Sequence, residues 1–203
     1  MKVLKRTAAI VLVFAMIVGL SGCNEVKKAE ETLNSTMTAL QTGDFIGAAS
    51  YIKNDTYYLT KNALLSTYKD NGDLTKDIFS KLSYKINSAE KIDNSLVKMN
   101  VDITNVNMKN ILSSAVGDLF SLAISSAFDP EKQMSDEEMQ NKMAELISEG
   151  INAEGAETVT STVDVNAVKT EDGWKIDADD KVIDAVTGGL LSTAESMGNA
   201  FGE

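Results

Sequence analysis

The chain of 203 residues contains no histidine, one cysteine and one proline. Without histidine, it cannot build a Ser-His-Asp or Cys-His catalytic site, or a His-ligated metal site, from its own residues. A lone cysteine excludes a disulfide within the chain. A single proline argues against long polyproline linkers. Any catalytic chemistry would therefore rest on carboxylates and tyrosines.

Acidic residues outnumber basic ones, with 30 Asp and Glu against 19 Lys and Arg. Three of the basic residues lie within the first 22 positions, so the rest of the chain carries a net charge of −14. Such a charge repels nucleic acid and anionic lipid headgroups, and we expect neither as a direct partner. The hydrophobic content of 43% is typical of a globular protein, and we expect one domain.

The first 22 residues have the three-part layout of a secretory signal. A basic start carrying Lys2, Lys5 and Arg6 precedes an uncharged apolar run over residues 7–20, and small residues follow. At ~1.5 Å rise per residue, this run would span about 21 Å, which is too short for a comfortable membrane helix.

The tetrapeptide Leu20-Ser21-Gly22-Cys23 resembles the lipobox of bacterial lipoproteins. The resemblance implies cleavage between Gly22 and Cys23, and a diacylglycerol on Cys23, with or without an added N-acyl group. Two or three acyl chains anchor a protein stably in a membrane, and we expect no other cofactor. The protein would then lie on the outer face of the cytoplasmic membrane. The alternative is that Cys23 is an ordinary cysteine after a signal peptide.

The expected organisation is a signal peptide over 1–22, a lipidated anchor and short spacer over 23–28, and an α+β domain over 29–203. Apolar residues from Val26 to Leu40 have helical spacing, so residues 24–28 equally fit the first turn of a helix. Gly43 and Asp44 indicate a helix stop followed by an N-cap. A third helix is expected to carry Tyr58, Leu64, Leu65 and Tyr68.

Strands follow from strict alternation of apolar and polar residues. The pattern holds over 82–86, 97–103 and 159–167, and a bulge or strand end is expected near Asn105. Glu171-Asp172-Gly173 predicts a hairpin turn, after which a strand begins at Trp174. These strands predict a curved antiparallel sheet of about four strands.

Two helices are expected between the second and third strands, as an insertion over 107–150. Residues 111–128 are apolar, but Asp118 and a stripe of serines favour packing on protein over membrane insertion. Ser135 and Glu138 form a capping-box pattern, and Gly150 is the expected helix stop. The methionines of this segment are interpreted as core residues. Beyond the last strand, a capped helix breaks at Gly188-Gly189, and a further amphipathic segment follows.

A second resemblance lies in the run from Ala29 to Ala49, which contains Gly43-Asp44-Phe45, and in Asp172-Gly173-Trp174-Lys175-Ile176. Both segments are similar to small lipoprotein domains with a cystatin-like or nuclear-transport-factor-like fold, many of them uncharacterised surface lipoproteins of Gram-positive bacteria. The resemblance implies a long helix, a short helix and a curved sheet. Such folds include isomerases, dehydratases and binding modules, so it implies no single activity.

The leading functional hypothesis is a non-enzymatic lipoprotein that binds a small apolar ligand or a protein partner between sheet and helices. The candidate ligand-binding residues are Tyr58, Tyr84, Phe120 and Trp174. One alternative is a proton-transfer or hydrolytic enzyme that uses buried Asp and Tyr, with candidates Tyr57, Tyr58, Tyr84 and Asp102. Asp102 occupies a polar position of its strand, however, which normally faces water. Another alternative is an accessory subunit whose helices over 111–150 dock on a membrane partner.

An acidic cluster near the C-terminus consists of Asp177, Asp179, Asp180 and Asp184. Carboxylates suit Ca²⁺, but the spacing of a calcium-binding loop is missing, and helix capping by Asp179 or Asp180 accounts for part of the pattern. We therefore expect no metal site.

Overall fold

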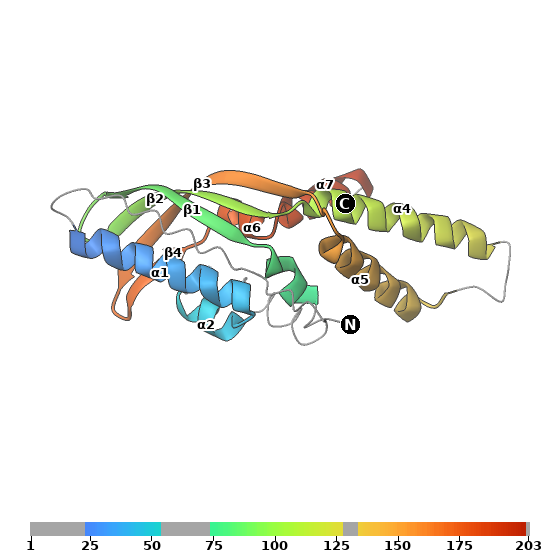
Figure 1. Cartoon of the computed structure of the whole chain (residues 1–203), viewed down its shortest axis with the longest axis horizontal. Coiled ribbons are helices and arrows are strands. Elements are labelled where there is room, and N and C mark those ends of the chain that lie inside the picture. Colours follow the sequence, from blue (N-terminus) through green and yellow to red (C-terminus); the bar gives the residue numbers. More distant parts are fainter. Residues whose placement is uncertain (1–22, 54–73, 128–133, 202–203) are drawn as a thin grey trace, which may run out of the picture.

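The computed structural model describes residues 23–53, 74–127 and 134–201. In these residues a four-stranded sheet is accompanied by helices (Figure 1). The strands are β1 (Ser83–Lys91), β2 (Leu96–Val106), β3 (Thr158–Thr170) and β4 (Gly173–Asp177), and they lie side by side in this order. Each neighbouring pair is antiparallel. The expected α+β class with a curved antiparallel sheet is confirmed.

The sheet has one buried and one polar face because its residues alternate as predicted. On β2 the side chains that enter the core are those of Val97, Met99, Val101 and Ile103. The residues between them face outward: Lys98, Asn100, Asp102 and Thr104. The pairing of β2 with β3 continues without a bulge to Val106, where the strand ends. Of the two features expected near Asn105, a bulge or a strand end, the strand end is therefore observed. The irregular pairing lies instead in β1, between Ile86 and Ser88.

Helices α1 (Cys23–Thr42) and α2 (Phe45–Ser50) are associated with the buried face of the sheet (Figure 1). The core face of α1 consists of Ala29, Leu33, Met37 and Leu40. Helix α1 begins at Cys23, so residues 24–28 are its first turns rather than a separate spacer. Asp44 caps α2 as predicted, because its Oδ1 accepts a 2.9 Å hydrogen bond from the Gly47 N–H.

Residues 74–80 form a helix that the sequence analysis did not predict. Ile78 and Phe79 of this helix are buried, and the Phe79 ring lies 5.6 Å from the Phe45 ring, centre to centre. The predicted third helix with Tyr58, Leu64, Leu65 and Tyr68 falls outside the described residues.

Helices α4 (Met108–Ala127) and α5 (Asp136–Asn152) form a hairpin between β2 and β3 that projects beyond the end of the sheet (Figure 1). The inserted helical pair is thus present. Its two ends meet at the sheet, where the Asn107 N–H donates to the Glu157 carbonyl at 2.8 Å. The predicted capping box also forms, since Ser135 and Glu138 exchange hydrogen bonds between side chain and backbone.

Two predictions for this hairpin are wrong. Gly150 does not end α5, which continues to Asn152; instead, a Cβ at Gly150 would lie 3.0 Å from the Ile111 side chain, so the glycine permits close packing of the helices. The apolar side of α4 is not packed on protein along its whole length: Ala115 is buried and Leu119 half-buried, whereas Phe120 is 66% exposed. No helix in the described residues has the length and apolar character needed to cross a membrane.

The C-terminal part contains α6 (Asp180–Val186) and α7 (Leu190–Phe201). Asp179 caps α6 by accepting a 2.9 Å hydrogen bond from the Val182 N–H. The predicted break at Gly188-Gly189 is confirmed, because both glycines have positive φ, 65° and 84°. A Cβ at Gly188 would lie 1.9 Å from the Val106 carbonyl oxygen, so only glycine fits at this crossing of the chain.

Candidate functional site

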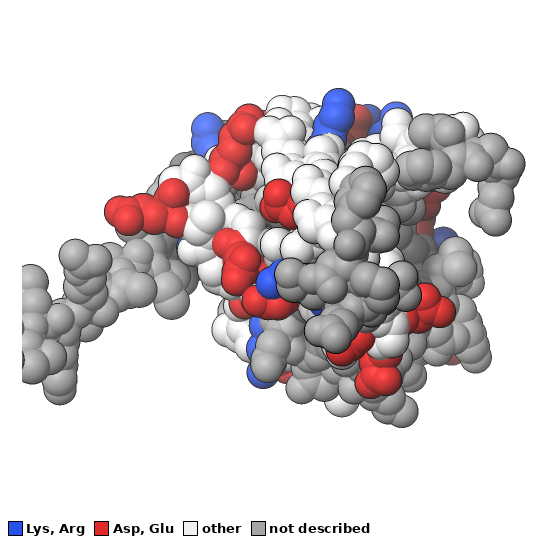
Figure 2. All heavy atoms as spheres, turned by 90° about the vertical axis from the view of Figure 1, so that its right-hand side faces the viewer, with Lys and Arg blue, Asp and Glu red and all other residues white. Residues whose placement is uncertain are grey.

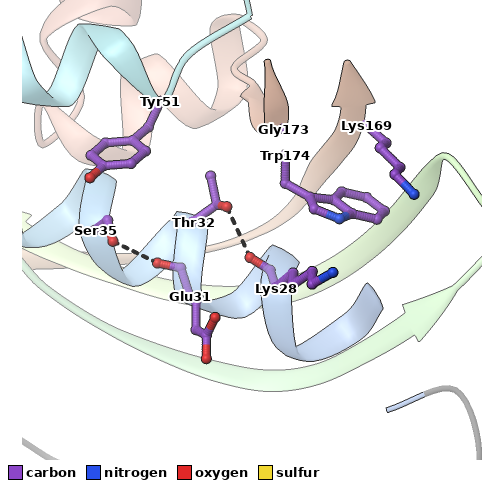
Figure 3. Close-up of a pocket in the computed structure, with 8 residues that line it drawn as sticks. All are labelled: Lys28, Glu31, Thr32, Ser35, Tyr51, Lys169, Gly173 and Trp174. Atoms are coloured by element: carbon purple, nitrogen blue, oxygen red, sulfur yellow. Dashed lines mark hydrogen bonds between the residues drawn. The ribbon is translucent and has the colours of Figure 1, made fainter. Parts of the chain in front are cut away.

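A surface pocket of about 400 Å³ lies between α1, the end of α2 and the β3–β4 hairpin (Figure 3). Eight residues line it: Lys28, Glu31, Thr32, Ser35, Tyr51, Lys169, Gly173 and Trp174. The described interior between α1 and the sheet is occupied by core side chains instead, and Leu33, Met37, Met99 and Ile103 are among those fully buried. The pocket therefore lies on the surface of the molecule rather than between α1 and the sheet.

One wall of the pocket is a polar stripe of α1. Lys28, Glu31, Thr32 and Ser35 are spaced at i, i+3, i+4 and i+7, which places them on one side of the helix. The Thr32 and Ser35 hydroxyls donate to the Lys28 and Glu31 carbonyls, each at 2.9 Å (Figure 3). Because these bonds occupy the hydroxyl protons, the Thr32 and Ser35 oxygens can only accept further hydrogen bonds.

The opposite wall comes from the β3–β4 hairpin. Lys169 and Trp174 are paired in the antiparallel register, so their side chains are neighbours on one face of the sheet. Trp174 is 8% exposed, and Lys169 is exposed. Gly173 adopts φ 104°, and no heavy atom lies within 4 Å of where its Cβ would be, so the turn leaves the mouth of the pocket open.

Tyr51 closes the far end of the pocket (Figure 3). Its carbonyl accepts a 2.8 Å hydrogen bond from the Ile176 N–H, and the Lys53 N–H donates to the Ile176 carbonyl at 2.9 Å. These two bonds attach the segment after α2 to the edge of β4. The ring position is thereby fixed by the sheet rather than by α2 alone.

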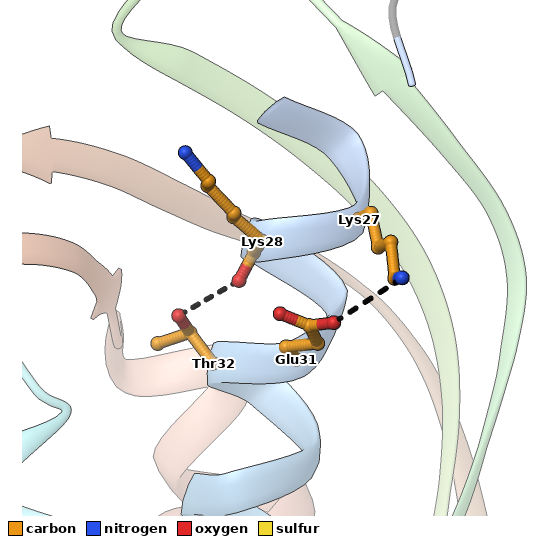
Figure 4. A network of polar contacts seen from close by, with 4 residues as sticks. All are labelled: Lys27, Lys28, Glu31 and Thr32. Atoms are coloured by element: carbon orange, nitrogen blue, oxygen red, sulfur yellow. Dashed lines mark hydrogen bonds and ion pairs between the residues drawn. The ribbon is translucent and has the colours of Figure 1, made fainter. Parts of the chain in front are cut away.

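The pocket holds two lysines for which no ion pair is found among the described residues, Lys28 and Lys169. Glu31, the carboxylate of the lining, lies 3.8 Å from the Lys27 ammonium, and its side chain extends toward Lys27 while Lys28 extends the other way (Figure 4). Neither the Trp174 N–H nor the Tyr51 hydroxyl has a hydrogen-bond partner in the described part of the chain. The pocket therefore offers donors beside an apolar indole surface, an arrangement that suits an anion with a flat apolar part.

The predicted ligand-binding residues are not brought together by the structure. Trp174 lines the pocket, whereas Tyr84 and Phe120 do not, and Tyr58 falls outside the described residues. The Tyr84 hydroxyl donates a 2.7 Å hydrogen bond to Asn34 Oδ1, and burial raises the pKa of this phenol above its ordinary value. Phe120 lies on the projecting hairpin. Ligand binding by Tyr84 and Phe120 stays a prediction.

Asp102, the carboxylate candidate for proton transfer, lies on the outward face of the sheet, as its parity predicted. The Thr162 hydroxyl donates to Asp102 Oδ1 at 2.7 Å, and this bond, with a further one from Asn87, lowers the pKa of the carboxyl. A general base works best with a pKa near the operating pH, so this shift runs in the wrong direction. Burial raises the pKa of Glu30, but Glu30 lines neither pocket described here. The candidate Tyr57 falls outside the described residues.

A second hollow of about 380 Å³ lies on the polar face of the sheet. Its lining includes Lys98 and Asp164, which form an ion pair of 2.8 Å, and Asn100, which donates to the same carboxylate at 3.1 Å. These groups satisfy one another, which leaves less capacity for a ligand than the first pocket offers.

The acidic cluster serves the local structure. Asp179 caps α6, Asp184 Oδ1 accepts a 2.8 Å hydrogen bond from the Ser192 N–H at the start of α7, and Asp177 lies 3.6 Å from the Lys53 ammonium. Among the residues that the structure describes, no group of three or more acidic or cysteine side chains is placed to hold a metal ion.

Comparisons with known proteins give one distant structural likeness. No protein-family model matches the chain, and no curated protein matches it. Among solved structures, the chain is similar to an NTF-2-like protein of unknown function from Shewanella oneidensis MR-1, with 10% identity over 74% of this chain and 92% of that chain, and a TM-score of 0.41. That neighbour bears the name of one of the two folds that the sequence motifs resemble. Because the sequence identity and the TM-score are both low, this likeness carries no argument about function. The α+β class rests on the observed topology.

Proposed function

We propose that the chain is a lipid-anchored, extracytoplasmic binding protein without catalytic activity, and that its pocket holds a small organic anion with a flat apolar part. The observation that supports this function is the presence, beside the Trp174 indole, of two lysines that form no ion pair with another described residue, Lys28 and Lys169. The chain as a whole carries a net charge of −11, so two such lysines in one pocket are notable. The Trp174 indole in the same pocket adds an apolar surface to the two ammonium groups.

This ligand class is narrower than the apolar ligand expected from the sequence. An apolar ligand would need space between α1 and the sheet, where Leu33 and Met99 are fully buried in a packed core. The external pocket instead combines the apolar surface of Trp174 with charged and polar donors. An aromatic carboxylate or an aromatic phosphate ester satisfies both features, since the ring covers Trp174 and the anion meets the ammonium groups.

The affinity that this site supports is modest. An exposed ion pair contributes about 0.2–1 kcal/mol, and the pocket supplies two of them. Together with partial burial of one ring, this suggests a dissociation constant in the millimolar to high-micromolar range. A modest affinity is consistent with a protein that samples a ligand at the cell surface rather than one that stores it.

The anchor would place this pocket near the membrane. The lipobox-like sequence ends at Cys23, which is also the first residue of α1. Lys28 is five residues further on, a distance of about 7.5 Å along a helix at 1.5 Å per residue. A lipid on Cys23 would therefore hold the pocket close to the headgroup layer, with no flexible linker between them.

Intrinsic fluorescence offers a direct test, because Trp174 is the single tryptophan of the chain. The purified lipidated protein in detergent would be titrated with phenyl phosphate and benzoate, and with uncharged benzyl alcohol. We expect the two anions to change the Trp174 emission saturably, with benzyl alcohol at least about fivefold weaker. Lys28→Gln combined with Lys169→Gln should weaken anion binding about tenfold.

Two matched controls accompany the titration. Lys109→Gln removes an exposed lysine at the start of α4 and should leave binding unchanged, as should Asp102→Asn on the outer face of the sheet. Equal binding of the anions to the double lysine variant and the unmodified protein would refute the proposed pocket. Turnover of phenyl phosphate that is abolished by Asp102→Asn would instead favour the enzyme.

A further inference from the structure

The outer half of the α4–α5 hairpin exposes large apolar side chains that the pocket function does not use. Phe120 is 66%, Ile124 47%, Leu122 39% and Met139 39% exposed. Phe120 and Ile124 are four residues apart and therefore share one side of α4. By contrast, Met108 and Ala115 nearer the base of the same helix are buried, so the exposure is confined to the part that projects beyond the sheet (Figure 1).

The same hairpin is strongly acidic. The exposed carboxylates on its helices are Asp118, Asp136, Glu137, Glu138, Glu145 and Glu149. Over the described residues 110–127 and 134–152, Lys142 is the single basic residue, and its ammonium lies 2.8 Å from Glu145. Figure 2, which looks onto this end of the molecule, shows Asp and Glu side chains beside broad uncharged areas.

We propose that this hairpin docks a basic, amphipathic helix of a protein partner. The partner's apolar side would cover Phe120 and Ile124, and its lysines or arginines would meet the exposed carboxylates of α4 and α5. Helices recognise one another in this way when an apolar stripe is flanked by charges of opposite sign. Carboxylates outnumber cations on the hairpin: apart from Lys109 at the base of α4, the described residues of its two helices contain Lys142 as their basic residue, and Lys142 is paired with Glu145. This excess of negative charge sets the sign of the charge that the partner must carry.

Charge also decides against the other occupants. A second copy of the chain would bring two acidic hairpins together, and like charges across an interface cost free energy. An anionic membrane surface is repelled for the same reason. The hairpin further lies at the opposite end of the molecule from the start of α1 at Cys23 (Figure 1). A lipid on Cys23 would thus leave the hairpin free to project from the membrane toward a partner.

Site-specific photocrosslinking in native cells tests this surface on the full anchored protein. Phe120→p-benzoylphenylalanine places a reactive ring at the centre of the exposed stripe. The matched control is Ile46→p-benzoylphenylalanine, because Ile46 on α2 is 75% exposed and lies outside the hairpin. We expect an adduct at position 120 whose crosslinked segment, identified by mass spectrometry, carries net positive charge and apolar residues at helical spacing, and no such adduct at position 46.

A charge-removing variant provides the second arm. Asp118→Asn with Glu137→Gln and Glu149→Gln should reduce the adduct at position 120 by about fivefold or more, while circular dichroism shows unchanged helix content. The proposal is overturned by an adduct to a second copy of the chain, to lipid, or to an acidic or uncharged segment. It is also overturned by the absence of any adduct at position 120, or by an adduct that the charge-removing variant leaves unchanged.

Discussion

The side-chain amide of Asn105 donates a 2.7 Å hydrogen bond to the carbonyl of Val186, 81 residues further along the chain. The same Nδ2 donates to the Ile78 carbonyl at 2.9 Å, and Oδ1 accepts from the Val106 N–H at 2.8 Å. Asn105 is fully buried. One side chain thus joins the end of β2 to α6 and to the helix over residues 74–80.

Asn105→Ala should lower the free energy of unfolding by about 2–4 kcal/mol, because the buried Ile78 carbonyl and the partly buried Val186 carbonyl would each lose a donor. Chemical denaturation measures the loss. Asn87→Ala serves as the control, since Asn87 is half-buried on β1 and makes a longer side-chain bond of 3.3 Å to Asn100. A loss no larger than that of the control would show that Asn105 does not join these elements.

Gly188→Ala should destabilise the fold by at least about 2 kcal/mol, because φ is 65° and the new Cβ would meet the Val106 carbonyl. Gly198→Ala is the opposite case: Gly198 lies within α7 with no neighbouring heavy atom within 4 Å of the added carbon. That substitution should be neutral or stabilise by up to about 1 kcal/mol. Thermal unfolding of both variants checks the contrast, and similar melting temperatures would contradict it.

Tyr84→Phe should change how stability depends on alkaline pH. Burial holds the pKa of the folded-state phenol above its ordinary value of 10.0, so the unfolded chain releases this proton first. The stability contributed by the neutral phenol is therefore fully present below about pH 10 and is lost as pH rises through the folded-state pKa. At pH 7 the free energy of unfolding of the variant should be about 0.5–1.5 kcal/mol lower, because the bond to Asn34 is missing. Above pH 10 its free energy of unfolding should fall less with pH than that of the parent protein. Urea denaturation at both pH values measures this; parallel pH profiles would contradict it.

Cys23→Ala should abolish lipid attachment and leave the leader uncut, because the lipobox resemblance places both events at this residue. Detergent phase partitioning and intact mass distinguish the products. The protein with Cys23 in place should carry at least two acyl chains, since one chain gives only marginal membrane binding. A free sulfur in the native protein would contradict the anchoring proposal.

Features determined by neighbouring residues were predictable from the sequence. Asp44 and Ser135 cap their helices as expected because a cap depends on three or four consecutive residues. The alternation of β2 was equally clear, since every second residue faces the core. The prediction for Gly150 was wrong because a glycine that accommodates a neighbouring helix has the same sequence signal as one that ends its own helix.

The pocket could not be predicted, since its walls come from three distant segments. Lys28 and Lys169 carry no local pattern that distinguishes them from other surface lysines, and Tyr51 reaches the pocket through backbone bonds to β4. The polar spacing from Lys28 to Ser35 was visible in the sequence, but it is typical of any exposed helix side. The exposure of Phe120 was also hidden, because an apolar helix face looks the same whether it packs on the chain or on a partner.

The helical hairpin between β2 and β3 also bears on how fast the sheet assembles. Asn105 pairs with Val159 across the whole insertion, and closing an unstructured loop of about 50 residues costs about 2 kcal/mol more than closing one of about five. If α4 and α5 pair first, the Asn107–Glu157 contact brings the strand ends together beforehand. Refolding should then slow when Ser135→Ala weakens the start of α5, although this residue touches no strand. The α4–α5 hairpin, although it projects beyond the sheet, would in that way set the rate at which β2 pairs with β3.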